Sequence, residues 1–250
     1  AGNKQWVREY TGFEVGKDLF THCNPDIAGD GLRMAWEVGA GKTEMTMELN
    51  YLIPDNMGYF AIDAVMRQPN LMVNLSGERF LNEEIMGNGT FTGNAIARQK
   101  GRCAFVIMDE SIKRHYRRNG LDLVSFVHGA DIIDRFDSEI ELALQNGYEH
   151  FFVADTIEEL AQKTGIDSFG LKETIDRYNR DCKTRDTLFY KNYRYMRPIE
   201  KPKFYAARFF PSAYGSLGGI KINHRTEVLT QDFEVIPGLY AAGTDACSIF

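Results

Sequence analysis

Apolar residues at helical spacing predict two helices near the start of the chain. Residues 3–10 form the first short pattern. Residues 32–38 form the second, in which Leu32 and Ala35 fall on one face. Asp30 precedes this second pattern at the position where an N-cap residue is preferred. We therefore expect Asp30 to cap the second helix.

The middle of the chain alternates apolar runs with helical patterns. Residues 103–108 are continuously apolar, which predicts a buried strand, and short strands are expected at 71–75 and 151–153. Asp109 is placed to cap a helix that ends at Gly120. Three more helices are expected, marked by the capping boxes Ser138/Glu141 and Thr156/Glu159 and by the apolar stripe of Leu171, Ile175, Tyr178 and Cys182.

The last part of the chain is rich in strand-forming residues and glycine. Residues 204–210 predict one strand, and residues 219–222 and 227–229 predict a hairpin. Residues 235–243 predict a turn followed by a strand of small residues. Residues 183–203 are basic, aromatic and contain proline, which indicates irregular structure.

These patterns place a mixed block of helices and strands between two ends rich in strands and glycine. We expect the block at residues 48–207 and the ends at residues 1–47 and 208–250. The predicted fold class is therefore α+β. Because both ends look like parts of one sheet, we expect the middle block to interrupt a single domain.

Composition narrows the function further. The chain has 250 residues, of which 44% are hydrophobic and 26% charged, as in a soluble globular protein. Its net charge of −6 argues against a nucleic-acid partner. No apolar run reaches the roughly 18 residues of a membrane span. Four cysteines without a CxxC pair and five scattered histidines predict no metal site. The isolated cysteines favour reduced thiols and therefore a cytoplasmic chain. A targeting signal upstream of Ala1 stays an open alternative.

Four separated stretches carry a resemblance to a known family. They are AGDGLRMAWEVGA at 28–40, VNLSGERFLNE at 73–83, the two helix patterns within 156–179, and LGGIKI at 217–222 with IPGLYAAG at 236–243. In this order and spacing the chain resembles the fumarate reductase/succinate dehydrogenase flavoproteins over essentially its whole length. The resemblance implies an FAD-dependent oxidoreductase in which a capping domain interrupts a Rossmann-like FAD-binding domain.

The resemblance also implies that part of the FAD-binding domain is missing. The family opens with a GxGxxG turn that cradles the pyrophosphate, and no such motif occurs here. We therefore expect residues 48–207 to be the capping domain and residues 1–47 and 208–250 to be incomplete pieces of the FAD-binding domain. Such a fragment is expected to bind FAD weakly or not at all and to be inactive alone. Exposed strand edges at both ends predict self-association.

The resemblance assigns four candidate cofactor-binding residues. Asp30 corresponds to the Asp of the family's TGDG segment, which contacts the flavin, and helix capping is its alternative role. Ala242 and Gly243 would let the backbone approach the cofactor closely. Thr244 stands where the family usually has a Glu that binds the ribityl region of the flavin.

The family's substrate-binding groups do not occur at the matching positions. The Arg that donates a proton would fall within residues 84–88, and two His would fall within 212–216 and 49–54. Because dicarboxylate recognition relies on such groups, we expect a substrate other than fumarate or succinate. Tyr214 is then the candidate proton donor. Arg67 lies one residue from a family clamp Arg and is the candidate substrate-binding residue.

Two functions remain open at this point. In the first, the parent protein reduces or desaturates a C–C bond of a small molecule by hydride transfer at the flavin N5 atom. In the second, the chain is a flavin-free, cap-like module that binds a small molecule or a partner without catalysis. A GxGxxG motif upstream of Ala1 would favour the first.

Overall fold

The structure is a computed structural model that describes residues 2–21, 24–124 and 129–247. The chain forms two compact units. The terminal unit is built from both ends of the chain, up to Asn50 and from Ser212 onward, and the central unit spans Tyr51–Pro211. Which unit caps a flavin and which binds it stays a prediction.

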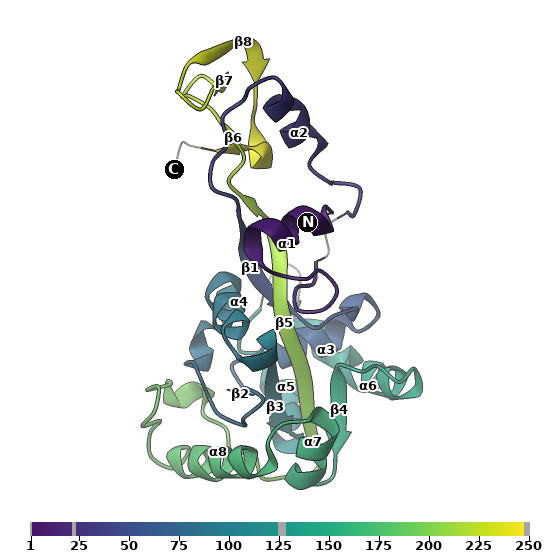
Figure 1. Cartoon of the computed structure of the whole chain (residues 1–250). Coiled ribbons are helices and arrows are strands. Elements are labelled where there is room, and N and C mark those ends of the chain that lie inside the picture. The colour runs from purple at the N-terminus through teal and green to yellow at the C-terminus, as the bar shows by residue number, and fades with distance from the viewer. Residues whose placement is uncertain (1, 22–23, 125–128, 248–250) are drawn as a thin grey trace. The chain divides into compact units, whose positions relative to one another are not determined.

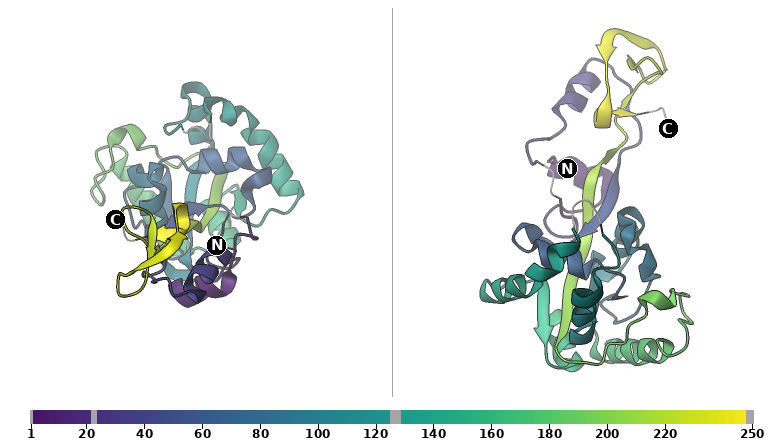
Figure 2. Two further views of the ribbon diagram at one scale, coloured as in Figure 1. Left: turned by 90° about the horizontal axis from the view of Figure 1, so that it is seen from above. Right: turned by 180° about the vertical axis from the view of Figure 1, so that it is seen from behind.

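A sheet of five strands organises the central unit (Figures 1 and 2). Its strands are β1 (Thr46–Leu52), β2 (Leu71–Val73), β3 (Ala104–Asp109), β4 (Phe151–Ala154) and β5 (Phe204–Leu217). They run in the order β1-β5-β3-β2, and β4 also pairs with β5. Ala207 of β5 faces Val106 of β3 and Phe151 of β4 in antiparallel register. Every residue of β3 is buried, which confirms the predicted buried strand.

Six helices of the described central unit surround this sheet. They are α3 (Phe60–Met66), α4 (Gly89–Ala97), α5 (Glu110–Asn119), α6 (Phe136–Gln145), α7 (Ile157–Thr164) and α8 (Ser168–Asp181). Short 3-10 turns are η1 (Asn56–Gly58), η2 (Glu83–Gly87), η3 (Lys100–Arg102), η4 (Ala130–Arg135) and η5 (Tyr193–Tyr195). Among the described residues, every helix is too short or too polar to cross a membrane.

The predicted caps of two helices are confirmed. The Asp109 carboxylate accepts the N–H of Ile112 at 3.0 Å and starts α5. The Thr156 hydroxyl accepts the N–H of Glu159 at 3.1 Å and starts α7. The Glu159 carboxylate reaches back to the N–H of Asp155 at 2.8 Å, one residue before the cap. These side chains satisfy N–H groups that a helix start leaves without a partner.

The capping box predicted at Ser138 and Glu141 is wrong. Ser138 lies inside α6, and its hydroxyl donates to the carbonyl of Arg135 at 2.9 Å. The turn η4 leads directly into α6 at Phe136. Since η4 already supplies helical backbone, the first N–H groups of α6 need no side-chain cap.

The terminal unit packs helix α2 on a group of short strands. Its described elements are α1 (Lys4–Thr11), α2 (Asp30–Glu37), β6 (Ile220–Lys221), β7 (Glu227–Leu229), β8 (Val235–Tyr240), η6 (Gly243–Asp245) and β9 (Ala246–Cys247). Strands β6 and β9 are parallel, and β7 and β8 are antiparallel. Buried residues of α2 and the strands form its core, namely Leu32, Ala35, Ala40, Ile220, Ile222 and Val228.

Two predictions for the terminal unit require correction. Residues 219–222 and 227–229 do not form a hairpin ladder, because β7 pairs with β8 and only Ile222 bridges to Val228. Asp30 does not cap α2, since Gly29 is the N-cap and Asp30 is the first helical residue. The Asp30 carboxylate instead pairs with Arg33 at 2.9 Å. Gly29 adopts a φ of +89°, a conformation that glycine accommodates easily. The helix therefore begins at Asp30, one residue earlier than the pattern predicts.

Candidate functional site

Two segments far apart in the sequence meet in the terminal unit. Asp30 and Gly31 begin α2, and η6 ends at Asp245. A Cβ atom at Gly31 would lie 2.7 Å from Oδ2 of Asp245, and one at Gly219 would lie 2.3 Å from the Asp245 carbonyl oxygen. At Gly219 the neighbouring atom is backbone, so this position requires glycine, whereas the neighbour of Gly31 is the end of a side chain that can move. The approach brings the first turn of α2 against the turn that holds the other predicted cofactor residues.

The predicted cofactor residues of this turn are open to a ligand. Ala242, Gly243 and Thr244 are exposed. Gly243 has φ +71°, and no heavy atom lies within 4 Å of the position a Cβ would take. Backbone without side chains in front of it permits the approach of a cofactor. Within the terminal unit, Asp245 at the end of this turn lies against Gly31, which follows Asp30.

The chemistry of these groups fits the sugar-like part of FAD. The Asp30 and Asp245 carboxylates accept hydrogen bonds, and the Thr244 hydroxyl donates and accepts. Ribityl hydroxyls suit such partners, whereas a phosphate would be repelled by both carboxylates. The sequence alone assigned no role to Asp245, which follows the candidate Thr244. A carboxylate one residue beyond the family's Glu position was the available signal.

Arg67 lies at the end of α3 in the central unit, where neighbouring groups fix its guanidinium. Its Nε donates to Oδ2 of Asp63 at 2.6 Å, and its Nη2 donates to the Tyr51 carbonyl at 2.5 Å. The guanidinium carbon lies 4.4 Å from the centre of the Tyr51 ring. Sequence reasoning missed Asp63, although its spacing of four residues from Arg67 on a helix predicts such a pair.

The charge of Arg67 is balanced inside this cluster. Burial alone would lower the pKa of Arg67, but Asp63 and Tyr51 raise that pKa above its ordinary value. Burial raises the pKa of Tyr51 to about 12, and the Tyr51 hydroxyl donates to the Met86 carbonyl at 2.7 Å. Near neutral pH, Arg67 is therefore a fixed cation beside a neutral Tyr51. An anionic ligand would have to compete with Asp63 for the guanidinium.

The remaining predicted site residue, Tyr214, stands on β5 in the terminal unit with 65% of its surface exposed. Its hydroxyl is thus accessible. Arg67 belongs to the central unit with Asp63, so contacts within the units do not join it to the cofactor residues. The four candidate cofactor residues and Tyr214 thus belong to the terminal unit, and Arg67 belongs to the central unit.

Two buried cysteines, Cys103 and Cys182, are unsuited to nucleophilic chemistry. Burial raises the pKa of Cys182 to about 12 and raises the pKa of Cys103 above its ordinary value. Both thiols stay protonated near neutral pH and are poor nucleophiles. In the described ranges, no group of three His, Cys, Asp or Glu side chains is arranged to hold a metal ion. Cys23 lies outside the described residues.

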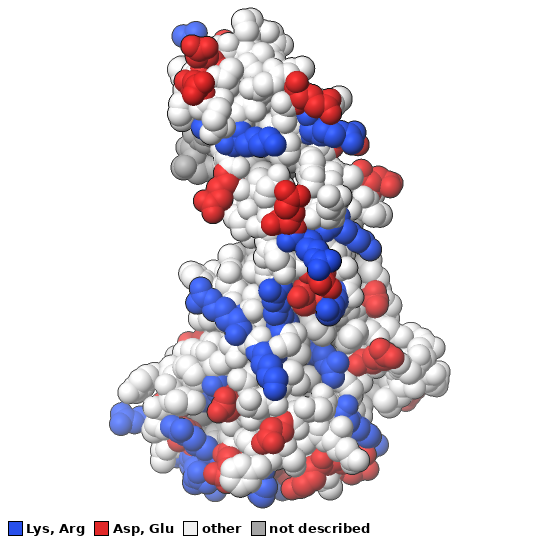
Figure 3. Space-filling model, viewed as in Figure 1, with Lys and Arg blue, Asp and Glu red and all other residues white. Residues whose placement is uncertain are grey.

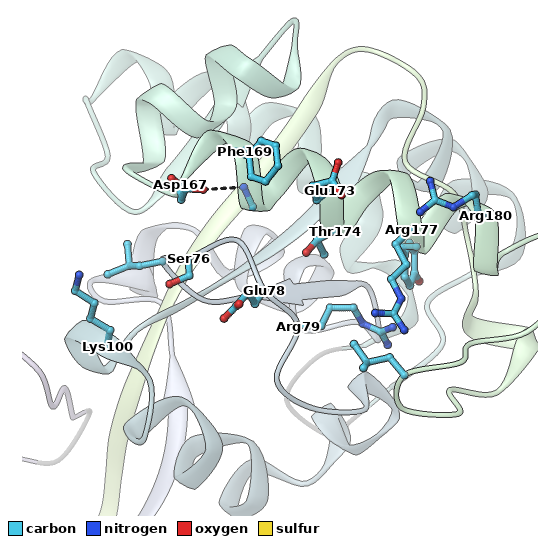
Figure 4. Close-up of a pocket in the computed structure, with 14 residues that line it drawn as sticks. Ser76, Glu78, Arg79, Lys100, Asp167, Phe169, Glu173, Thr174, Arg177 and Arg180 are labelled. Atoms are coloured by element: carbon cyan, nitrogen blue, oxygen red, sulfur yellow. Dashed lines mark hydrogen bonds between the residues drawn. The ribbon is translucent and has the colours of Figure 1, made fainter.

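A separate cavity of about 980 Å³ lies in the central unit, between α8 and the turn after β2 (Figure 4). Leu75, Arg79, Lys100, Phe169, Arg177 and Arg180 are among its lining residues. None of the predicted flavin or substrate residues lines it. The cavity is therefore a second feature of the surface, distinct from the site that the sequence predicts.

Comparison with known protein families decides between a flavoprotein and an unrelated α+β fold. Residues 2–250 match the family described as FAD binding domain. The chain belongs to this family. The match confirms the flavoprotein resemblance carried by the four sequence stretches. The mixed arrangement of helices and sheet also agrees with solved structures of flavoprotein fumarate reductases.

Curated and solved relatives of this chain are named as reductases, oxidoreductases or dehydrogenases. It is 32% identical to the vinyl phenol reductase of Lactiplantibacillus plantarum over 88% of this chain and 47% of that protein. It is 29% identical to the NADH:acrylate oxidoreductase of Vibrio harveyi, over 96% of this chain and 22% of that protein. The solved structure of the open conformation of a flavocytochrome c3 fumarate reductase matches with a TM-score of 0.64 and 25% identity. The match covers 98% of this chain and 39% of that chain. The chain therefore spans less than half the length of each of these relatives.

Proposed function

We propose that this chain is part of an FAD-dependent oxidoreductase that reduces or desaturates a C–C bond of a small molecule other than fumarate or succinate. The observation that carries the proposal is the family match over residues 2–250. When bound, FAD supplies hydride transfer at its N5 atom. The terminal unit would be the part of the FAD-binding domain present here, and the central unit the capping domain. Self-association through strand edges belongs to the same proposal, and light scattering over a concentration series tests it.

Each candidate residue has a defined role in this proposal. The Asp30 and Asp245 carboxylates and the Thr244 hydroxyl hold the ribityl hydroxyls. The exposed backbone at Ala242 and Gly243 lies against the cofactor. The Tyr214 hydroxyl delivers a proton to the substrate carbon.

The surroundings of Arg67 support an uncharged or aromatic substrate. Recognition of a dicarboxylate needs cations whose charge is available, ideally in bidentate geometry. The Arg67 guanidinium already holds the Asp63 carboxylate and the Tyr51 carbonyl. Its net contribution to binding an anion is therefore small. The vinyl phenol reductase among the relatives supports an aromatic alkene as the substrate class.

Flavin binding is the first test. Because no GxGxxG turn occurs in this chain, titration of the purified chain with FAD, followed by flavin fluorescence and the visible spectrum, is expected to show weak binding at most. Asp30→Ala and Thr244→Ala should each lower this affinity by about tenfold, the effect of one lost hydrogen bond to the cofactor. Asp232→Ala removes an exposed carboxylate from the turn between β7 and β8 and is the matched control. Tight stoichiometric binding would contradict the expectation of an incomplete flavin site, and equal losses in all three variants would refute the assigned residues.

Turnover is the second test and requires the flavin-loaded protein. Oxidation of a reduced dye is followed after addition of a vinyl phenol, an enone or fumarate. Tyr214→Phe should lower kcat by about 100-fold with little change in KM, because it removes only the proton donor. Faster turnover of fumarate than of the other two compounds would contradict the substrate proposal. An unchanged kcat in Tyr214→Phe would contradict the role of that residue.

A further inference from the structure

The end of α8 and the loop that follows it are strongly basic. Residues 177–203, here called the basic segment, contain nine Lys and Arg against three Asp and Glu, a balance of +6. Since the whole chain carries −6, the remaining residues carry −12. Figure 3 shows Lys and Arg side chains at the lower left edge, where Figure 1 places the loop after α8. Positive charge is thus concentrated in this segment of the sequence, whereas Lys, Arg, Asp and Glu are interspersed over the rest of the face in Figure 3.

Burial sharpens this concentration of positive charge. Asp181 and Asp186 are buried, so Glu200 is the exposed acid of the segment. Two of its cations are compensated, Lys191 by Glu83 at 3.5 Å and Arg197 by Asp122 at 2.7 Å. The other seven are exposed and form no ion pair within the described ranges, namely Arg177, Arg180, Lys183, Arg185, Arg194, Lys201 and Lys203. The segment therefore presents seven cations against one anion to its surroundings.

Internal contacts hold the basic segment in place. The Asp186 carboxylate accepts two hydrogen bonds from Arg79, both at 2.9 Å, and one from the N–H of Lys191 at 3.0 Å. The Lys191 ammonium donates to the Tyr178 hydroxyl at 3.0 Å. The loop is thus tied to the body of the central unit through buried groups. A surface that is ordered before binding loses little conformational entropy when a partner arrives.

Large apolar and aromatic side chains stand beside these cations. Phe169, Tyr190 and Tyr193 are 76%, 75% and 66% exposed. The cavity next to α8 has Arg177 and Arg180 at one end (Figure 4). Exposed aromatic residues together with arginine around a hollow are typical of the anchor points of protein interfaces.

We propose that the basic segment and the adjoining cavity form a docking surface for a partner protein. The partner presents acidic side chains around at least one apolar side chain. The apolar side chain enters the cavity beside Phe169, and the acidic ones face Arg177, Arg180 and the loop that follows. This proposal does not depend on the proposed oxidoreductase function, because no candidate flavin or substrate residue contributes to the surface.

Two observations favour a protein over an extended polyanion such as a nucleic acid or an anionic membrane. The remainder of the chain carries −12 and would repel a long or planar anion that reached beyond the basic segment. Glu78 and Glu173 also line the cavity, between Lys100 at one end and the arginines at the other (Figure 4). A compact partner with a local acidic patch meets only the cations at the arginine end.

The experiment measures binding of the full chain to a fluorescein-labelled peptide of glutamates around one phenylalanine. Fluorescence anisotropy is expected to show binding that weakens between about 0.05 M and about 0.5 M salt. Arg177→Glu/Arg180→Glu should weaken it by about tenfold or more, because each reversal replaces an attraction by a repulsion. Lys183→Glu/Arg185→Glu changes the loop instead of the helix and should give a similar loss. Circular dichroism verifies that both variants are folded.

The control Lys4→Glu/Arg118→Glu reverses two exposed cations outside the segment and makes the same change in net charge. Full retention of binding by this control is expected. An equal loss in the control would overturn the proposal, since net charge alone would then explain the effect. Absence of peptide binding at low salt would also overturn it. Tighter binding to phosphatidylglycerol vesicles or to an oligonucleotide, lost in the same variants, would replace the protein partner by a membrane or a nucleic acid.

Discussion

Replacing Asp186 by Asn tests whether buried charges hold the basic segment to the central unit. The carboxylate of Asp186 accepts four hydrogen bonds. Oδ1 accepts from Arg79 Nη1 at 2.9 Å and from the N–H of Leu188 at 3.1 Å. Oδ2 accepts from Arg79 Nη2 at 2.9 Å and from the N–H of Lys191 at 3.0 Å. In Asp186→Asn, one of these oxygens becomes an NH₂ group that faces two donors.

The expected cost has two parts. Burial alone would raise the pKa of Asp186, but the bonds from Arg79 and the backbone lower it from 3.8 to about 2. This difference corresponds to about 2 kcal/mol of unfolding free energy at neutral pH. The donors left facing the new NH₂ group add about 1 to 3 kcal/mol. Asp186→Asn should therefore lower the free energy of unfolding by about 3 to 5 kcal/mol near neutral pH.

The charge-dependent part also predicts a pH dependence. The folded-state pKa of Asp186 is below its unfolded value, so its contribution is complete above about pH 5 and is lost as pH falls through 3.8 towards about 2. The wild-type chain loses this stability on acidification, whereas Asp186→Asn has none of it to lose. The difference between the two proteins should shrink by about 2 kcal/mol over this range.

Denaturant unfolding followed by far-UV circular dichroism measures the effect. Both tryptophans, Trp6 and Trp36, belong to the terminal unit, so their fluorescence follows that unit separately. Because the chain has two units, each transition is analysed by its own midpoint and slope. The dichroism transition should shift more than the fluorescence transition.

Asp176→Asn, on the helix α8 that precedes the loop of Asp186, is the matched control. Its half-exposed carboxylate pairs with Lys172 at 3.0 Å, and an exposed pair of this kind contributes no more than about 0.5 kcal/mol. A loss below about 1 kcal/mol in Asp186→Asn at neutral pH would refute the reasoning. So would a difference from the wild type that stays constant between pH 5 and pH 2.

Three further substitutions test other parts of the central unit by the same unfolding measurement. Arg67→Met leaves Asp63 buried without the Arg67 cation and should lower the free energy of unfolding by about 3 to 5 kcal/mol. Adding Asp63→Leu to this variant should restore a large part of that loss, because it removes the buried carboxylate. A further loss in the double variant would contradict this. Gly77→Ala should cost more than about 3 kcal/mol, because φ is +76° and the new Cβ would lie 2.2 Å from the Leu171 nitrogen. Near-wild-type stability would disprove this contact. Thr156→Ala should cost about 1 kcal/mol and Thr156→Ser much less.

Local signals account for the parts of the fold that the sequence predicts correctly. The caps at Asp109 and Thr156 lie within a few residues of the N–H groups they bind. The stripe on α8 needs only its helical period, and Leu171, Ile175 and Tyr178 are all buried. Such features depend on neighbours in the chain and can therefore be derived without knowledge of the tertiary structure.

Strand pairing could not be derived in the same way. The pattern predicts that β5 ends at Phe210, where Pro211 interrupts the apolar run, but the strand continues to Leu217. The residue pattern of β7 at 227–229 does not indicate whether this strand pairs with residues 219–222 before it or with β8 after it. Pairing is decided by which segments can bury their apolar faces together, and this depends on contacts remote in sequence.

The candidate site residues also divide into contacts that are local in sequence and contacts that are remote in sequence. Asp63 and Arg67 are four residues apart on α3, so their pairing was accessible from the sequence. The contact of Asp245 with Gly31 joins opposite ends of the chain, and no periodicity encodes it. The glycine at position 31, where a Cβ atom would lie 2.7 Å from the Asp245 carboxylate, signals this contact only once the structure is known. The resemblance to a flavoprotein family, rather than the patterning, directed attention to these segments.

The structure also explains what the VNLSGERFLNE stretch does. Arg79 forms a double hydrogen bond with Glu83, at 2.9 and 2.7 Å, and a second one with Asp186 of the basic segment. Gly77 lies against the backbone of α8 at Leu171. The stretch therefore joins the turn after β2 to α8 and its loop through buried charges and a close backbone approach. The stretch therefore supports the fold of the central unit, and this structural role accounts for its residues without a contact to substrate. Under the proposed function, the contacts to substrate are assigned to Tyr214 and Arg67 instead.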